Sequence, residues 1–188
     1  MKVKHIASAV LVAAFAVACG GPKTAPVEEM TLKDAVGDKF LIGTALNVNQ
    51  VAGRDTNATN IVKTQFSAIV PENCMKMEEV QPEEGKFTFE DADAFVKFGE
   101  ENGLTMTGHC LIWHSQCPEW FCVDKNGKNV TPEVLKQRMK THITTVVQHF
   151  KGKLKGWDVV NEAIIEDGSY RKLSLIHISE PTRHLRIS

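Results

Sequence analysis

The stretch GWDVVNEA, residues Gly156–Ala163, decides the fold of this chain. Together with Leu154 it is nearly continuous in apolar residues, which is typical of a buried strand, and the strand ends on Asn161 and Glu162. A carboxylate is costly to bury unless its charge is paired or used. The Asn-Glu pair therefore indicates either a turn with a helix cap or a site built at the strand end. Polar residues after the preceding strands favour the site.

Three further apolar runs precede this strand, and helical patterns separate them. The sequence predicts strands over residues 40–46, 66–70, 104–113 and 154–161. It predicts helices over residues 56–64, 91–102 and from Thr131 to about residue 150. Thr131 and Pro132 are typical of a helix start, whereas Gly103 and Gly152 stand where helices end.

This alternation of strands and helices predicts an α/β protein with a parallel sheet, either doubly wound or a (β/α)₈ barrel. In both architectures ligands bind at the carboxyl ends of the strands. Polar residues gather at those ends here: Glu72, Asn73 and Lys76; His109, Trp113, His114 and Gln116; Asn161 and Glu162. No Gly-rich phosphate loop follows the first strand, which counts against a dinucleotide-binding fold.

Three motifs at these strand ends resemble those of family 10 glycoside hydrolases. They are ENCMK (Glu72–Lys76), HCLIWHSQ (His109–Gln116) and WDVVNEA (Trp157–Ala163). Members of that family are retaining endo-1,4-β-xylanases on a (β/α)₈ barrel. The resemblance covers residues 37–172 and implies the N-terminal half of a TIM barrel, about strands 1–4, so that the barrel is incomplete.

The resemblance also assigns roles by position. Glu162 matches the general acid/base, and Asn161 matches its neighbour that contacts the sugar at the cleavage site. The residues that match groups binding xylose units on the non-reducing side are Glu72, Asn73 and Lys76. Those that match groups lining the site next to the scissile bond are His109, Trp113 and Gln116. These residue types suit sugars, because flat indoles stack on sugar faces while amides and amines bind hydroxyls.

The resemblance implies xylan or xylo-oligosaccharides as the substrate and no cofactor. Two other functions stay open. Another retaining barrel glycosidase, such as a cellulase, shares the Asn-Glu pair of the fourth strand. A cell-surface glycan-binding lipoprotein would need aromatic platforms but no acid/base. A metal site at His109, Cys110 and His114 is not expected, because their alternation does not suit one tight site.

Other conspicuous side chains have structural interpretations. Trp120 and Trp157 are expected to pack, and His142 and His149 to face solvent. Four cysteines remain once Cys19 is set aside: Cys74, Cys110, Cys117 and Cys122. They allow three full disulfide pairings, among which the sequence does not choose, and Cys117 and Cys122 are close enough in sequence to bridge. Buried unpaired thiols are the other interpretation for Cys74 and Cys110.

A retaining glycosidase needs a second carboxylate as nucleophile, and in this family a Glu on a later strand supplies it. After Glu162 the chain offers only Glu166, Asp167 and Glu180, and none matches that motif. A TIM barrel typically takes about 250 residues. We therefore expect these 188 residues alone to be unstable and inactive, with strands one and four as unpaired sheet edges.

The two ends of the chain are expected to lie outside the barrel. Lys2, Lys4 and the apolar run 6–18 predict a signal peptide over residues 1–18. Cys19 is expected to be lipidated, with residues 19–36 as a flexible tether, which makes the protein an exported periplasmic or cell-surface lipoprotein of a bacterium. Its membrane contact would be the lipid anchor alone. The segment 173–188 (LSLIHISEPTRHLRIS) is expected to be a non-native tail.

Composition fits a globular protein and excludes one class of partner. The chain has 43% hydrophobic and 24% charged residues, with 22 Lys and Arg against 23 Asp and Glu. Its net charge of −1, without a basic block, counts against nucleic-acid binding.

Overall fold

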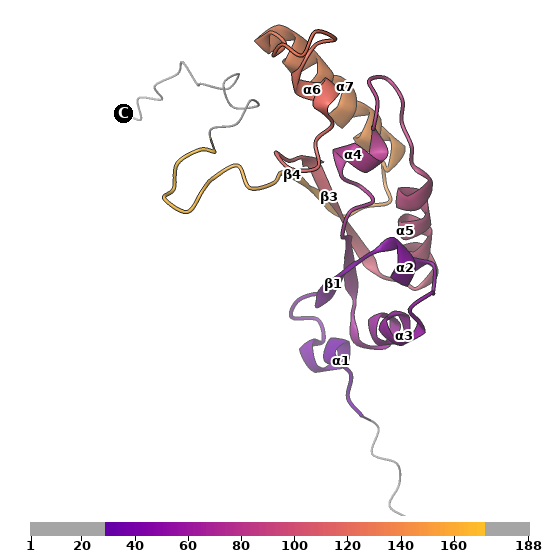
Figure 1. Cartoon of the computed structure of the whole chain (residues 1–188). Coiled ribbons are helices and arrows are strands. Elements are labelled where there is room, and N and C mark those ends of the chain that lie inside the picture. Colours follow the sequence, from indigo (N-terminus) through magenta and orange to yellow (C-terminus); the bar gives the residue numbers. More distant parts are fainter. Residues whose placement is uncertain (1–28, 172–188) are drawn as a thin grey trace, which may run out of the picture.

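The computed structural model describes residues 29–171 (Figure 1). Its elements in chain order are α1 (Leu32–Val36), β1 (Gly43–Leu46), α2 (Val48–Val51), α3 (Thr56–Gln65), β2 (Ala68–Pro71), α4 (Met77–Val80), α5 (Glu90–Glu101), β3 (Thr105–Ile112), α6 (Glu119–Cys122), α7 (Pro132–His149) and β4 (Gly156–Val160). The predicted signal peptide, Cys19 and the segment 173–188 lie outside the described residues. Between residues 29 and 171, no helix combines the length and apolar character needed to cross a membrane.

The four described strands are parallel and form one sheet in the order β1-β2-β3-β4. The sheet confirms the parallel α/β arrangement expected from the alternation of strands and helices. Figure 1 shows α2, α3 and α5 together on one side of this sheet. Since β1 and β4 each pair with a single strand in the described part of the chain, both are sheet edges, as the sequence predicts.

The edge strands are shorter and more exposed than the apolar runs suggest. β1 begins at Gly43, and the preceding Phe40 and Leu41 are 60% and 56% exposed. In β4, Val159 and Val160 are 52% and 53% exposed. An apolar run is buried only where a neighbouring element covers it, and within residues 29–171 no strand lies beyond either edge. The prediction of a buried strand over residues 40–46 is therefore wrong at its start.

Helix α1 lies within the predicted tether, residues 19–36. The Thr31 side chain accepts a hydrogen bond from the Asp34 N–H, and the Asp34 carboxylate accepts one from the Thr31 N–H. The Leu32 N–H also donates to Oε1 of Gln65 in α3 at 2.9 Å. The prediction of a flexible tether is wrong for this helix. A capping box and a long-range hydrogen bond stabilise it, and neither interaction produces the apolar periodicity by which a helix is recognised in a sequence.

The core fills the space between the sheet and the helices. Phe95 and Phe98 of α5 are buried, as the sequence predicts, and Leu135 and Val146 of α7 belong to the same cluster. Along β3 the buried positions alternate up to Cys110, which is the period of a strand with one face toward a core. The helices are therefore held on the sheet by apolar contacts from both layers.

Both tryptophans that were expected to pack do so. Trp157 contacts the core, and a Cβ on Gly108 would lie 2.3 Å from its ring, so glycine is what lets the indole lie across β3. Trp120 also packs against the core, and its Nε1–H donates to the carbonyl of Gln81 at 3.3 Å.

Helix α7 begins as predicted but buries a histidine. The Thr131 hydroxyl accepts from the Val134 N–H at 3.4 Å, and Pro132 is the first helical residue. His142 was expected to face solvent, and this is wrong: it is 0% exposed. Its spacing of seven from Leu135 places it on the apolar stripe. His149 is exposed, as predicted, and stacks on Phe89.

The buried His142 makes the stability of the fold depend on pH. Its Nδ1 lies 2.9 Å from Oε1 of Gln81, and burial lowers its pKa from 6.5 to about 4. Because the unfolded chain binds this proton below pH 6.5 while the folded chain does so only near pH 4, stability falls over that interval as the pH drops. We expect His142 to account for a loss of about 2–3 kcal/mol between pH 7 and 4.

Urea unfolding at a series of pH values measures this effect in the chain completed to a full barrel, because the 188 residues alone are expected to be unstable. His142→Gln cannot titrate, so its unfolding free energy should change less over the same range than that of the unmodified protein. Equal pH dependence in the two proteins would show that His142 is not the group responsible.

Candidate functional site

The ends of β2 and β3 bring four of the predicted site residues together around one amine. Lys76 directly precedes α4 and is only 7% exposed. Its Nζ donates to Oδ1 of Asn73 at 2.9 Å and to Oε1 of Gln116 at 2.7 Å. The same Nζ lies 4.6 Å from the centroid of the Trp113 ring. Lys76 and Gln116 are 40 residues apart in sequence, so this cluster confirms that the two strand ends meet.

The Lys76 cluster suits a polar ligand. A buried ammonium must be hydrogen-bonded, and here two amide oxygens and an aromatic face satisfy it. Trp113 is partly exposed, with the Lys76 ammonium over its ring. The arrangement therefore orients two amides and an indole at one end of the sheet.

Removing this amine should destabilise the fold. In the chain completed to a full barrel, Lys76→Met leaves the oxygens of Asn73 and Gln116 without their charged donor. This is expected to cost about 1–3 kcal/mol of unfolding free energy in urea. Lys97→Met is the matched control, because Lys97 lies on the surface, 3.7 Å from Glu101, and should contribute less than about 1 kcal/mol. Equal losses in the two variants would contradict the special role of Lys76.

Glu162 stands two residues after the end of β4, with a φ of 53°. Its Oε2 lies 3.6 Å from Nε2 of His114 and 3.7 Å from Nη2 of Arg171. Arg171 also donates from Nε to the Glu162 carbonyl at 3.0 Å, so the Arg171 side chain contacts both the carboxylate and the backbone carbonyl of Glu162. His114 packs edge-on against Trp113, with ring centroids 5.6 Å apart. Glu162 is thereby linked through His114 and Trp113 to the Lys76 cluster.

Asn161 and Glu72 also lie at strand ends. The Asn161 N–H donates to the carbonyl of Ile112, the last residue of β3, at 2.9 Å. Asn161 is half-buried, while Glu72 is exposed. The Glu72 N–H donates to the carbonyl of Leu46 at the end of β1 at 2.8 Å. All four strands thus contribute their carboxyl ends to the same edge of the sheet.

His109 is held by a residue that sequence reasoning missed. Its Nδ1 lies 3.0 Å from Oδ2 of Asp158, its register partner on β4. The sequence did contain a signal that Asp158 has a partner, because Asp158 is a charged residue inside an otherwise apolar strand. His109 pairs with Asp158 and His114 with Glu162, while Cys110 is buried at 1% exposure. The two histidines therefore contact different carboxylates.

His114 and Arg171 are the other contacts that the sequence did not assign. His114 stands inside the third-strand motif, but nothing local indicates that it meets Glu162, 48 positions later. Arg171 follows a loop in which the Arg171 N–H donates to the Ala163 carbonyl at 2.9 Å. Its role depends on how that loop folds back, which sequence patterns do not encode.

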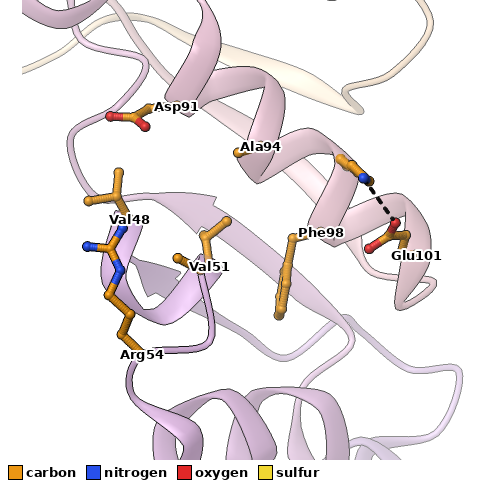
Figure 2. A pocket seen from close by; sticks show the side chains of 9 residues that line it. Val48, Val51, Arg54, Asp91, Ala94, Phe98 and Glu101 are labelled. Carbon is orange, nitrogen blue, oxygen red and sulfur yellow. Dashed lines mark ion pairs between the residues drawn. The ribbon is translucent and has the colours of Figure 1, made fainter.

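A cavity of about 480 Å³ lies in the loop after Glu162 and is lined by Ile164, Ile165, Glu166, Asp167 and Arg171, but not by Glu162 itself. Figure 2 shows a cavity of about 520 Å³ between α2 and α5, with Val51 and Phe98 facing it and Arg54 and Asp91 at its border. A smaller cavity of about 190 Å³ is lined by Asn73 together with Asn47 and Cys74. Among the residues predicted for the site, only Asn73 lines one of these cavities, and the rest of the candidate site is an open strand-end surface.

Comparison with known proteins finds both a family model and individual relatives that match this chain. The family model described as Glycosyl hydrolase family 10 matches residues 31–180. An endo-1,4-beta-xylanase A of Xylanibacter ruminicola is 50% identical over 151 residues, which cover 80% of this chain and 41% of the relative. An exoglucanase of Acetivibrio thermocellus is 40% identical over 158 residues, covering 80% of this chain and 14% of the relative.

The solved structures agree. An intracellular xylanase from Thermoanaerobacterium saccharolyticum matches with a TM-score of 0.75 and 36% identity, over 82% of this chain and 50% of that protein. The solved relatives are (β/α)₈ barrels, and the four parallel strands correspond to part of such a barrel. The chain spans about two fifths of the length of its Xylanibacter relative. Because the family model covers most of the sequence, the chain belongs to glycosyl hydrolase family 10.

Proposed function

We propose that this chain is part of an endo-acting, retaining glycosidase that hydrolyses β-1,4-xylosidic linkages in xylan, with Glu162 as the general acid/base. The observation that carries the proposal is the contact of Glu162 with His114, at 3.6 Å, and through Trp113 with the Lys76 cluster. A carboxyl group at a strand end, beside an indole and amides, can donate a proton to the departing glycosidic oxygen.

The remaining site residues take supporting roles in this proposal. Glu72, Asn73 and Lys76 bind sugar units on the non-reducing side of the cleaved bond. His109, Trp113 and Gln116 line the position next to that bond, and Asn161 hydrogen-bonds the sugar there. The His109–Asp158 pair, at 3.0 Å, keeps the His109 ring in one orientation. The Trp113 ring offers a flat apolar surface to a sugar face.

The proposal can be tested in a protein that completes the barrel. Residues 29–171 are joined to the part of the Xylanibacter ruminicola xylanase that follows its match to this chain; we call the product the joined protein. We expect it to fold, as judged by circular dichroism, and to release reducing sugars from xylan. A folded joined protein without action on xylan would overturn the proposal.

A cellulase is the second candidate, because one relative is an exoglucanase. Parallel assays on xylan and carboxymethylcellulose distinguish the two. We expect the joined protein to be at least about tenfold faster on xylan, which corresponds to about 1.4 kcal/mol of discrimination. A preference for cellulose would assign the cellulase instead. A joined protein that binds xylan without cleaving it would favour the glycan-binding alternative.

These 188 residues alone are expected to show no turnover, since no residue after Glu162 matches the second carboxylate. Robust release of reducing sugar by a polypeptide of this sequence, sensitive to Glu162→Gln, would contradict that expectation.

We also propose that residues 1–18 direct export and that Cys19 is lipidated, which would make the protein a periplasmic or cell-surface lipoprotein. A basic head followed by an apolar run and a cysteine supports this. Labelling bacteria that express the chain with a palmitate analogue should mark the normal sequence but not a Cys19→Ala variant. Equal labelling of both would reject the anchor.

A further inference from the structure

Two segments of the chain carry the Lys76 cluster, and each continues into a single turn of helix. The β2 segment, residues 72–86, contains Lys76 and then α4. The β3 segment, residues 113–130, contains Trp113 and Gln116 and then α6. Since the sugar contacts of the proposed site come from both segments, their position relative to each other decides the shape of the cluster.

Hydrogen bonds join the two segments along α4. Besides the contact of Lys76 Nζ with Gln116 Oε1, the Glu78 N–H donates to the Gln116 carbonyl at 3.1 Å. Farther along both segments, the indole Nε1–H of Trp120 donates to the Gln81 carbonyl at 3.3 Å. The contact between the segments therefore extends from the candidate site to Gln81, at the end of α4.

Arg138 of α7 joins the same two segments from the helix layer. Its Nε and Nη2 donate to Oε1 and Oε2 of Glu84 at 2.7 and 2.8 Å, which makes a bidentate pair. Its Nη1 donates to the carbonyls of Phe121 and Val123 at 3.3 and 3.1 Å, and also to that of Trp120. The guanidinium lies 5.6 Å from the centroid of the Trp120 ring. One side chain thus binds Glu84 of the β2 segment and the end of α6 in the β3 segment.

The Arg138–Glu84 pair differs from an ordinary surface ion pair. The Arg138 side chain is only 13% exposed, and two parallel hydrogen bonds to one carboxylate fix the orientation of the guanidinium. Lys86 and Glu83 of the same segment also pair, but their side chains are 69% and 66% exposed, where an ion pair contributes little. Glu83 is therefore a matched comparison for Glu84.

We propose that Arg138 is a positioning residue for sugar binding, which acts through Glu84 and Trp120 on the relative position of the two segments. Its contacts lie at α6 and Glu84, so it would not touch the sugar itself. Because Gln116 stands on one segment and Lys76 on the other, a shift between the segments disturbs their 2.7 Å contact and weakens binding. This inference rests on the proposed function, since it concerns the site where xylan would bind.

Binding can be measured in the joined protein carrying Glu162→Gln, which should cleave little. Isothermal titration calorimetry with xylotetraose gives a dissociation constant and the fraction of protein that binds. Arg138→Lys keeps the charge but loses the paired hydrogen bonds, so we expect the dissociation constant to rise by at least about fivefold. A merely structural role would lower the binding fraction and leave the dissociation constant unchanged, which would overturn the proposal.

Glu84→Gln is a second variant in the same protein, and the fold should tolerate it because Glu84 is 56% exposed. We expect its dissociation constant for xylotetraose to rise by at least about threefold, while Glu83→Gln, the matched control, stays within about 1.5-fold. If Arg138→Lys does not fold, these two variants decide the question. Equal dissociation constants for Glu84→Gln and Glu83→Gln would overturn the proposal.

A double variant shows whether Arg138 acts through the Lys76 cluster. Gln116→Ala removes the acceptor of Lys76, so a further Arg138→Lys change should weaken binding by less than about twofold. A further fivefold loss would mean that Arg138 acts by another route. Failure of the proposed function gives a different result, because the joined protein with Glu162 intact would then not cleave xylan. Failure of this inference alone leaves that cleavage unchanged.

Discussion

Glu162→Gln in the joined protein is expected to lower kcat on xylan by about 10²–10⁴-fold. Glutamine keeps the size and hydrogen-bonding capacity of the side chain but has no proton to donate to the leaving oxygen. The contact with His114, at 3.6 Å, can still form, so the fold should persist. Initial rates of reducing-sugar release at saturating xylan measure the effect.

The matched control is Glu166→Gln. Glu166 lies in the loop that follows Glu162 and is exposed, so it carries the same charge change without the same contacts. We expect its kcat to stay within about twofold of the unmodified protein, which corresponds to under about 0.5 kcal/mol. Similar losses in both variants would mean that net charge in this loop, and not proton donation by Glu162, governs the rate.

Phe95→Ala should have the largest effect on stability. The ring is 0% exposed in the core beneath the sheet, and truncating a buried Phe typically costs about 3–5 kcal/mol. Whole domains are stable by only about 5–15 kcal/mol, so this change should leave the joined protein close to unfolding. Urea denaturation followed by circular dichroism gives the difference.

Ile61→Ala is the control for that measurement. Ile61 is 55% exposed on the helix α3, so little packing is lost and we expect a change below about 1 kcal/mol. If Ile61→Ala cost as much as Phe95→Ala in the joined protein, the core assigned here would be wrong.

The local structure could largely be predicted from the sequence. Thr131 and Pro132 mark the start of α7, and Phe95 and Phe98 mark the buried face of α5, because capping and helical periodicity are short-range properties. The order of parallel strands also follows from the alternation of strands and helices. The grouping of the site residues could also be predicted, since parallel strands present their carboxyl ends at one edge of the sheet.

The errors arose where distant residues decide the outcome. The sequence predicts a solvent-facing His142, although its spacing from Leu135 puts it on the apolar stripe of α7. The residue that satisfies its buried ring, Gln81, lies 61 positions away. Phe40 is apolar but exposed, because its burial depends on an element that would have to lie beyond β1. Asp158 was not recognised as the partner of His109, because strand register, rather than local pattern, joins them.

The exposed edges have a physical consequence for handling the protein. β1 and β4 present unpaired backbone groups within the described sheet, and apolar side chains such as Val159 and Val160 are exposed there. Such edges favour association with other strands. The joined protein, in which further strands would cover them, is therefore the appropriate form for kinetic work.

The dependence of rate on leaving group tests the role of Glu162 most directly. Phenyl β-xylobioside needs a proton on its departing oxygen, whereas 2,4-dinitrophenyl β-xylobioside leaves readily as an anion. Comparing kcat/KM of Glu162→Gln with that of the unmodified joined protein, we predict a loss of about 10²-fold or more for the phenyl glycoside and less than about tenfold for the dinitrophenyl glycoside. An equal loss for both substrates would contradict proton donation by Glu162.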